Sequence, residues 1–312
     1  MKRTTLMTFA VVGALTILVV GAQAAAATPQ KQASVHGSPP GAPPPFVTPP
    51  GGSKAASPNA FGGVDTTLRR ADGSLFERES TDAAGRVLSQ EYYAQDGSGS
   101  RLTGSYASGG SASGTRMLAR AAPRRLQASC GNDARNPSAQ KWNSTMNWYW
   151  NQGSTPGYLN LDNTLTSLRG ARIAWESNQN WCGIADASTM NFTYQGTTTL
   201  SYGQNGVSTV GFGDVGNTGC GAGVLACTLR IWNGSNVITE ADTRLSTAVT
   251  WHNGGQSGTF DVQSVQTHES GHAIGFDHVN DSTNVMYPYI NSNDTSDRLL
   301  GRGDANENNA KY

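Results

Sequence analysis

The hydrophobic pattern of the chain predicts a strand, a helix and then several strands after residue 140. Residues 142–150 alternate apolar and polar positions, which is typical of a half-buried strand. Apolar side chains recur near helical spacing over residues 162–175, and Asp162 could cap the start of that helix. Every tryptophan also follows residue 140, so we expect the core there. Further strands are predicted at residues 192–194, 208–212, 227–232 and 237–245.

A smaller β unit is predicted ahead of this core. Over residues 61–106, short strand-like runs alternate with turn signals at Asp72-Gly73, Ala84-Gly85 and Asp96-Gly97, which indicates one or two hairpins. Residues 25 to about 60 are mostly Ala, Pro, Gly and Ser and cannot bury a core, so they are predicted to be a linker. A basic tract at residues 116–125 separates the two parts and is a suitable site for proteolysis.

The N-terminus has the pattern of a secretory signal. Lys2 and Arg3 precede an apolar run over residues 6–20, and Ala22-Gln23-Ala24 offers a cleavage site after Ala24. An uncleaved membrane anchor is the alternative, but this run is shorter than the roughly 20 residues that span a bilayer. Residues 1–24 are therefore predicted to be a signal peptide, and the mature protein is expected to be extracellular and not attached to a membrane.

Export changes how the four cysteines are interpreted. In an oxidising compartment an even number of cysteines favours disulfides over a thiolate metal site. Cys220 and Cys227 flank a glycine-rich segment that can close a small loop. Three pairings of the four cysteines are possible, and this loop favours the one in which Cys130 bonds with Cys182.

The overall charge argues against a nucleic-acid-binding protein. The chain has 22 basic and 22 acidic residues among 312, and only 14% of its residues are charged. A basic patch of the kind that binds phosphate backbones is not indicated.

The strongest chemical signal lies in residues 267–278. His268 and His272 are four residues apart, so on a helix both imidazoles project from one face toward a single cation. Glu269 lies beside them and can accept a proton from a water molecule on the metal. Gly275 suits the end of the helix because it adopts a left-handed conformation without strain, and His278 can then approach as a third ligand. Three imidazoles and an open position are typical of a single catalytic zinc ion.

Two histidines at this spacing are more often surface or packed side chains than metal ligands. Here three of the five histidines in the chain lie within residues 268–278, together with the glutamate and the glycine that the chemistry requires. This combination favours a metal site.

The segment from His268 to His278 resembles the zinc signature of the metzincin metallopeptidases, and in particular of the matrixins. Residues 284–289 resemble the matrixin Met-turn, which implies that Met286 forms an apolar floor below the metal. The resemblance also implies that Pro288, Tyr289 and Ile290 line a substrate pocket. It further implies an α+β, zincin-like fold in which a twisted mixed β-sheet accompanies an active-site helix and a Met-turn, with the substrate extended along an edge strand.

The sequence therefore predicts a secreted, monomeric zinc endopeptidase that acts on extracellular proteins or peptides, with Glu269 as general base toward a zinc-activated water. Residues 126–312 are predicted to form the catalytic domain, and residues 25–125 a propeptide. Calcium could also bind near residues 211–216. Two alternatives are a zinc amidase acting on cell-wall peptides and a non-catalytic zinc-binding or adhesion module.

The expected latency mechanism differs from that of the animal matrixins, which use a propeptide cysteine. No cysteine precedes Cys130, and the residues around Cys130 do not match that motif. An acidic residue such as Asp65 or Glu79 could cap the zinc instead, or the propeptide could block the site sterically.

Overall fold

A computed structural model describes residues 51–93, 98–107, 130–221 and 223–312. All of them belong to a compact unit formed by residues 37–312. The predicted signal peptide and the basic tract at residues 116–125 lie outside the described residues. Within the described part, no helix combines the length and the apolar character needed to cross a membrane.

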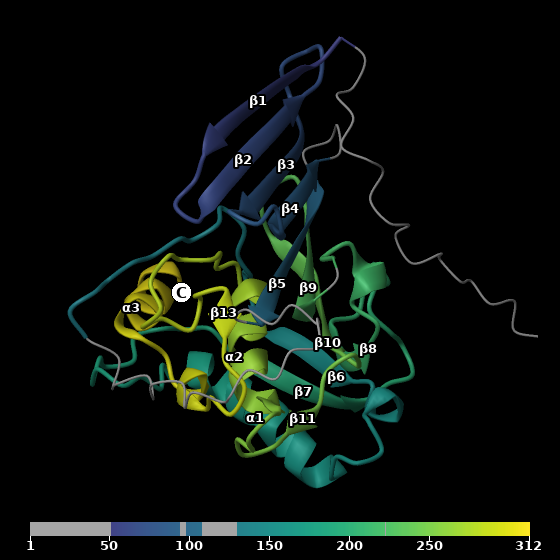
Figure 1. Cartoon of the computed structure of the whole chain (residues 1–312), viewed down its shortest axis with the longest axis vertical. Helices are drawn as coiled ribbons and strands as arrows, with labels where there is room; N and C mark the ends of the chain where they lie inside the picture. The colour runs from purple at the N-terminus through teal and green to yellow at the C-terminus, as the bar shows by residue number, and fades with distance from the viewer. Residues whose placement is uncertain (1–50, 94–97, 108–129, 222) are drawn as a thin grey trace, which may run out of the picture. The chain divides into compact units, whose positions relative to one another are not determined.

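The described residues form an α+β arrangement, and Figure 1 shows the order of its elements. The α-helices are α1 (Leu161–Glu176), α2 (Val262–Ala273) and α3 (Arg302–Lys311). Short 3-10 helices lie at Gln152–Ser154, Gly216–Thr218 and Ser296–Arg298. The strands are β1 (Ser53–Pro58), β2 (Gly62–Arg69), β3 (Leu75–Asp82), β4 (Val87–Tyr93), β5 (Gly99–Ala107), β6 (Met146–Trp150), β7 (Phe192–Thr197), β8 (Thr209–Gly213), β9 (Val224–Trp232), β10 (Ile238–Ser246), β11 (Trp251–His252), β12 (Phe260–Asp261) and β13 (Tyr289–Ile290).

Most of the described strands join one mixed sheet, in the order β1-β2-β3-β4-β5-β9-β10-β8-β6-β7, with β13 beside β5. The pairs β10–β8, β8–β6 and β6–β7 are parallel. Strand β9 runs antiparallel to β10 on one side and to β5 on the other. A mixed sheet with helices agrees with the predicted α+β class. The small β unit is continuous with the sheet of the later part of the chain through the β5–β9 pair.

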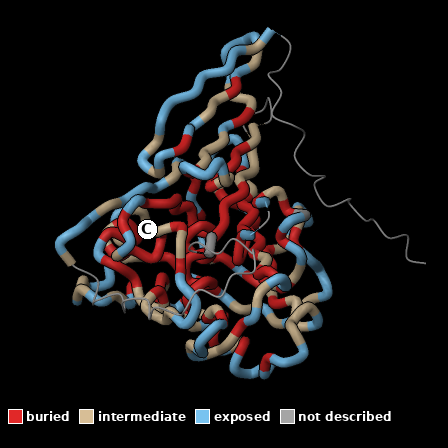
Figure 2. The backbone as a smooth tube through the Cα atoms, viewed as in Figure 1, coloured by how far each residue is buried: buried red, intermediate tan, exposed pale blue. Residues whose placement is uncertain are grey.

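The first five strands form an antiparallel meander. Gly73 and Gly85 adopt φ values of 83° and 76°, so the turns predicted at these two positions are confirmed. The turn predicted at Asp96-Gly97 lies outside the described residues. The linker was predicted to extend to about residue 60, but Ser53–Pro58 forms β1. This strand is exposed along its whole length (Figure 2), so it pairs with β2 through its backbone without burying apolar side chains.

Helix α1 lies against α2 and begins one residue earlier than predicted. Its N-cap is Asn160, whose side chain accepts a hydrogen bond from the Asn163 backbone at 3.0 Å. The predicted cap, Asp162, instead lies in the first turn, where its negative charge favours the positive end of the helix dipole. An amide side chain can cap a helix as well as a carboxylate can, so the sequence did not distinguish the two residues.

The main hydrophobic core lies in the later part of the chain, as the tryptophan distribution predicted. Trp148, Trp150, Trp175 and Trp251 are all almost completely buried in one cluster. Trp181 is the exception, because 44% of its surface is exposed. Two disulfides, Cys130–Cys182 and Cys220–Cys227, cross-link this part of the chain in the pairing expected from the sequence.

Candidate active site

Helix α2 places three of the predicted site residues. Its N-cap is Asp261, whose carboxylate accepts a hydrogen bond from the Ser264 backbone at 2.9 Å and two from the Arg298 guanidinium at 2.6 and 2.8 Å. These bonds satisfy an otherwise free backbone donor and neutralise a buried charge. Nearly every residue of α2 is buried (Figure 2), so the imidazoles at positions 268 and 272 are held inside the protein.

The end of α2 is fixed by a glycine and by the last residues of the chain. Gly275 has φ 95°, which confirms the predicted left-handed turn, and a Cβ there would lie 2.2 Å from the Gln140 carbonyl oxygen. The Lys311 ammonium donates to the Gly275 carbonyl at 2.7 Å, and the Tyr312 hydroxyl donates to the Ile274 carbonyl at 2.6 Å. Side-chain donors from α3 and its C-cap thus satisfy carbonyls that the helix end would otherwise leave unpaired.

The three predicted metal ligands converge. Nε2 of His278 lies 3.2 Å from Nε2 of His268 and 3.1 Å from Nε2 of His272. Nitrogens bound at about 2.0–2.1 Å to one tetrahedral zinc ion are about 3.3–3.4 Å apart, so this spacing fits zinc closely. Within the described part of the chain, this is the group of histidine, cysteine or acidic side chains that could hold a metal.

The tautomers of these rings also fit a cation. Nδ1 of His268 lies 2.6 Å from the Val285 carbonyl oxygen, and Nδ1 of His272 lies 2.8 Å from the Phe276 carbonyl oxygen. Each Nδ1 must donate its proton to that carbonyl, which leaves the Nε2 lone pair pointing inward. Burial, with repulsion from the neighbouring rings, holds the pKa of His272 and His278 well below the usual range. Converging neutral lone pairs repel one another unless a cation lies between them, so the residues present fit a zinc ion.

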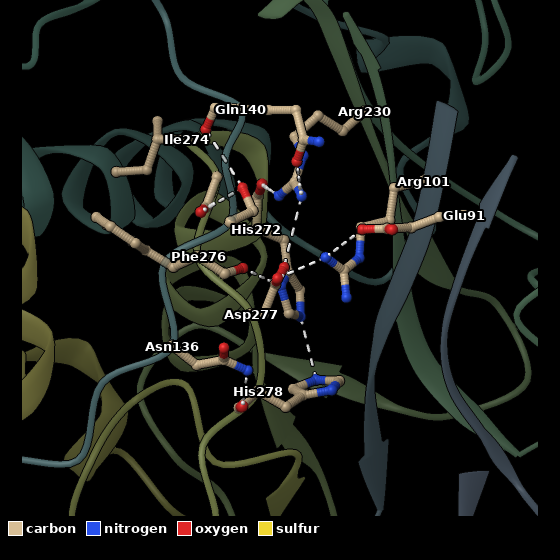
Figure 3. A network of polar contacts seen from close by, with 12 residues as sticks. Glu91, Arg101, Asn136, Gln140, Arg230, His272, Ile274, Phe276, Asp277 and His278 are labelled. Atoms are coloured by element: carbon tan, nitrogen blue, oxygen red, sulfur yellow. Dashed lines mark hydrogen bonds and ion pairs between the residues drawn. The ribbon is translucent and has the colours of Figure 1, made fainter. Parts of the chain in front are cut away.

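A buried polar network positions the loop between α2 and His278 (Figure 3). The Asp277 carboxylate forms ion pairs with the guanidinium groups of Arg101 on β5 and Arg230 on β9. Arg230 also donates to the His272 carbonyl at 2.7 Å. The Asn136 side chain donates to the His278 carbonyl at 2.9 Å. Because Asp277, Arg230 and Arg101 are buried or nearly so, the loop has little freedom to move His278 away from the other two rings.

The predicted base, Glu269, is completely buried. Burial raises its pKa to about 7, although hydrogen bonds from Thr228 and Ser105 act in the opposite direction. The Thr228 hydroxyl donates to Oε2 at 2.6 Å. Oε1 accepts from the Ser105 hydroxyl at 2.7 Å and from the Ser105 backbone N–H at 3.0 Å. Both oxygens of the carboxylate are therefore hydrogen-bonded, one to β9 and the other to β5.

Met286, the predicted Met-turn residue, is also completely buried. Its sulfur packs against Gly271, where an added Cβ would lie only 2.3 Å away. The Asp304 carboxylate accepts hydrogen bonds from the backbone N–H groups of Val285 and Met286 at 2.6 and 3.2 Å. Because the Val285 carbonyl in turn contacts His268, α3 helps to set the position of the first histidine through this turn.

The residues predicted to line the substrate pocket lie beside β5. Tyr289 and Ile290 form β13, whose backbone runs parallel to Tyr106 and Ala107 of β5. The Tyr289 hydroxyl donates to the Asp82 carboxylate at 2.7 Å, and Ile290 is buried in the main core. Pro288 immediately precedes this strand.

The acidic residues considered as zinc caps lie elsewhere. Asp65 accepts hydrogen bonds from Asn59 and Ser80 on the meander, and the Glu79 carboxylate accepts one from Gln90. The segment that contacts Glu269 is instead β5, through Ser105. In the region considered for calcium, the Asp214 side chain accepts a hydrogen bond from the Gly216 backbone at 2.8 Å, and calcium binding there stays a prediction.

Sequence reasoning missed the partners of the site residues. Ser105, Thr228, Arg101 and Asp304 belong to no recognised motif, and each is far from its partner along the chain. Only a spatial arrangement of the strands could have identified them.

Comparison with known families agrees with this geometry. A search of curated proteins found no match. The family model Peptidase_M10, described as Matrixin, matches residues 214–312, a segment that includes β9, α2, the three histidines and Met286. The match supports a metalloprotease of the zinc-dependent kind and confirms the resemblance inferred from the sequence. The part of the chain that holds the histidine triad is therefore matrixin-like.

Proposed function

We propose that this chain is a secreted zinc endopeptidase, made as a zymogen, that hydrolyses internal peptide bonds of extracellular proteins. His268, His272 and His278 hold the metal, and Glu269 is the general base. The family match supports zinc-dependent peptidase activity, and the geometry of the triad supports the choice of ligands.

One observation favours an endopeptidase in particular. The backbone of Gly104 lies beside the His278 ring, where it counteracts part of the lowering of that ring's pKa by burial, and the next residue, Ser105, donates its backbone N–H to Glu269. The peptide group between Gly104 and Ser105 therefore lies beside both the histidine triad and the catalytic base. That bond lies inside β5, which continues on both sides. A site that accepts the middle of an extended chain suits cleavage of internal bonds and favours this function over an amidase that acts on short peptides.

The chemistry follows from the positions of these groups. A bound zinc ion supplies a Lewis acid that polarises a peptide carbonyl and acidifies water. Glu269 takes a proton from the attacking water and passes it to the nitrogen of the leaving amine. The 3.0 Å contact between Ser105 N and Glu269 indicates where such a nitrogen would lie. Thr228 keeps the carboxylate oriented through its other oxygen.

The test replaces the base without changing its shape. Glu269→Gln should retain the fold and about one bound zinc ion per chain, but lose peptidase activity by at least about 100-fold. Glu176→Gln, the same substitution at the end of α1, is the matched control and should remain active. The purified protein is assayed on casein, with and without a zinc chelator, after the chain has been cut between β5 and Cys130. Chelator-sensitive cleavage by Glu269→Gln at the wild-type rate would exclude the proposed base.

Secretion is tested separately. The two disulfides agree with an oxidising compartment. N-terminal sequencing of protein recovered from the medium of a secreting host should find Ala25 first, whereas a protein retained in the membrane with Met1 would contradict the signal-peptide assignment.

A further inference from the structure

Strand β5 fills the space between two strands of the candidate active site. It pairs antiparallel with β9 from Gly99 to Tyr106, and its last two residues pair in parallel with β13. The backbone groups of β9 and β13 that face this space are thus already used by a segment of the same chain. Any other extended peptide would need the same groups, because main-chain pairing is how a peptide adds to a sheet edge.

The close approach of β5 to β9 depends on Gly104. A Cβ at this position would lie 2.5 Å from the Ala226 carbonyl oxygen and 2.8 Å from the Val224 side chain. The glycine therefore allows the strand to lie against β9 at the point where it passes the histidines. The following residue, Ser105, is buried and makes both of the β5 hydrogen bonds to Glu269.

Two further contacts hold the meander on this surface. Arg101 of β5 lies between Glu91 of β4, at 2.6 Å, and Asp277 next to the third histidine, and only 11% of the arginine side chain is exposed (Figure 3). At the other end, the Tyr289 hydroxyl of β13 contacts Asp82 and the Arg86 guanidinium near the turn between β3 and β4. A charged pair this far from water is costly to break by removing one partner.

We propose that β5 is an intramolecular inhibitor that occupies the substrate position and engages the catalytic carboxylate through the hydroxyl of Ser105. This proposal rests on the proposed peptidase function and adds its regulation. An attacking water molecule must donate its proton to Oε1 of Glu269. In this structure that oxygen already accepts hydrogen bonds from the hydroxyl and the backbone N–H of Ser105. When β5 leaves, Oε1 and the edge of β9 become free, while Thr228 still holds Oε2. Latency then requires no cysteine, and none precedes Cys130.

The experiment uses the full chain with a recognition site for a sequence-specific protease inserted between residues 114 and 115. After cleavage, native mass spectrometry and gel filtration measure how much of the N-terminal fragment stays bound to the rest. A fluorogenic peptide reports activity during dilution. Hydrogen exchange of the β9 backbone amides gives a readout independent of activity.

In the wild type, the fragment should stay bound and the β9 amides should stay protected, with activity rising only as the fragment dissociates. Ser105→Ala should weaken retention by about 10- to 100-fold, because it removes one hydrogen bond to a charged group, and should release activity at correspondingly higher protein concentration. Arg101→Gln should act in the same direction. Ser100→Ala, the same substitution five positions earlier on β5, is the matched control and should behave as the wild type.

Three results would overturn the proposal. The first is a cleaved wild-type chain that is fully active while the fragment is bound. The second is equal retention of the Ser105→Ala and Ser100→Ala fragments. The third is a new N-terminus at Ser105, because β5 would then be a substrate. If the released chain is inert but retention follows the predicted order, the peptidase function is contradicted and the docking of β5 is supported.

Discussion

Replacing Gly271 by alanine tests the packing below the histidine triad. Gly271 lies on α2 between His268 and His272, and a Cβ there would be 2.3 Å from the Met286 sulfur and 2.7 Å from a ring carbon of Trp175. Ordinary contacts between such atoms are about 3.5–4.0 Å. Neither neighbour can yield easily, because both are completely buried and the Trp175 indole N–H is bonded to the Thr267 carbonyl at 2.8 Å.

The expected magnitude combines two opposing effects. Overpacking a core costs about 1–3 kcal/mol, and two rigid neighbours place this site near the upper end. Alanine gains about 1 kcal/mol over glycine in a helix. Gly271→Ala should therefore lower the free energy of unfolding by about 2 kcal/mol and Tm by about 4–8 °C.

Gly170→Ala on α1 is the matched control. Its added Cβ would meet the side-chain amide of Gln263, at 2.7 Å from Nε2, and this flexible end can move away. The variant should be neutral or up to about 1 kcal/mol more stable than the wild type. Thermal unfolding is followed by circular dichroism with a chelator present, so that metal loss does not contribute. A Gly271→Ala protein with the Tm of the Gly170→Ala control would refute the packing argument.

Three further substitutions test buried carboxylates, two of which support the site. Asp261→Asn should lower the free energy of unfolding by about 1.5–3 kcal/mol in urea titrations, because it removes the charged partner of the partly exposed Arg298 guanidinium. An unchanged midpoint would contradict this role. Asp304→Asn should weaken zinc binding by about 10- to 100-fold in competition with a chelating dye, because Asp304 holds the turn whose carbonyl contacts His268. An unaltered zinc affinity would show that this turn does not position His268. Burial raises the pKa of Asp242 to about 7, so the folded protein holds this proton where the unfolded chain has lost it. The contribution of Asp242 to the free energy of unfolding should fall as the pH rises from about 4 to about 7. Asp242→Asn should therefore flatten the plot of unfolding free energy against pH over this range. Parallel plots for the variant and the wild type would exclude the raised pKa of Asp242.

The metal ligands were predictable because their spacing is local. Two histidines one helical turn apart, a glycine that ends the helix and a third histidine after it are all set by backbone geometry over eleven residues. The same holds for the turns at Gly73 and Gly85, where only the local φ value matters.

The groups that hold these residues in place were not predictable, because their contacts are long-range. Ser105 and Glu269 are 164 residues apart, and Arg101 and Asp277 are 176 residues apart. Nothing in the local pattern around residue 105 distinguishes that serine from the others in its Gly/Ser-rich surroundings. Its role depends on strand order, which single-sequence periodicity does not specify.

The hydrophobic pattern did not locate helix α3, for a different reason. Its sequence contains few apolar residues, so no hydrophobic stripe marks it. The helix is instead held by buried polar contacts, as where Asp304 binds the Met286 turn and the Asn308 side chain donates to the Trp175 carbonyl at 2.7 Å. Polar burial of this kind has no simple sequence signal.

The pairing of β5 with β9 also bears on aggregation. Strand β9 is nine residues long, almost entirely buried and mostly apolar, and it contains no proline. Without β5 it would be an exposed sheet edge of the kind that recruits strands from other molecules. A catalytic part produced without residues 51–107 should therefore tend to form insoluble aggregates, and supplying those residues during refolding should raise the soluble yield.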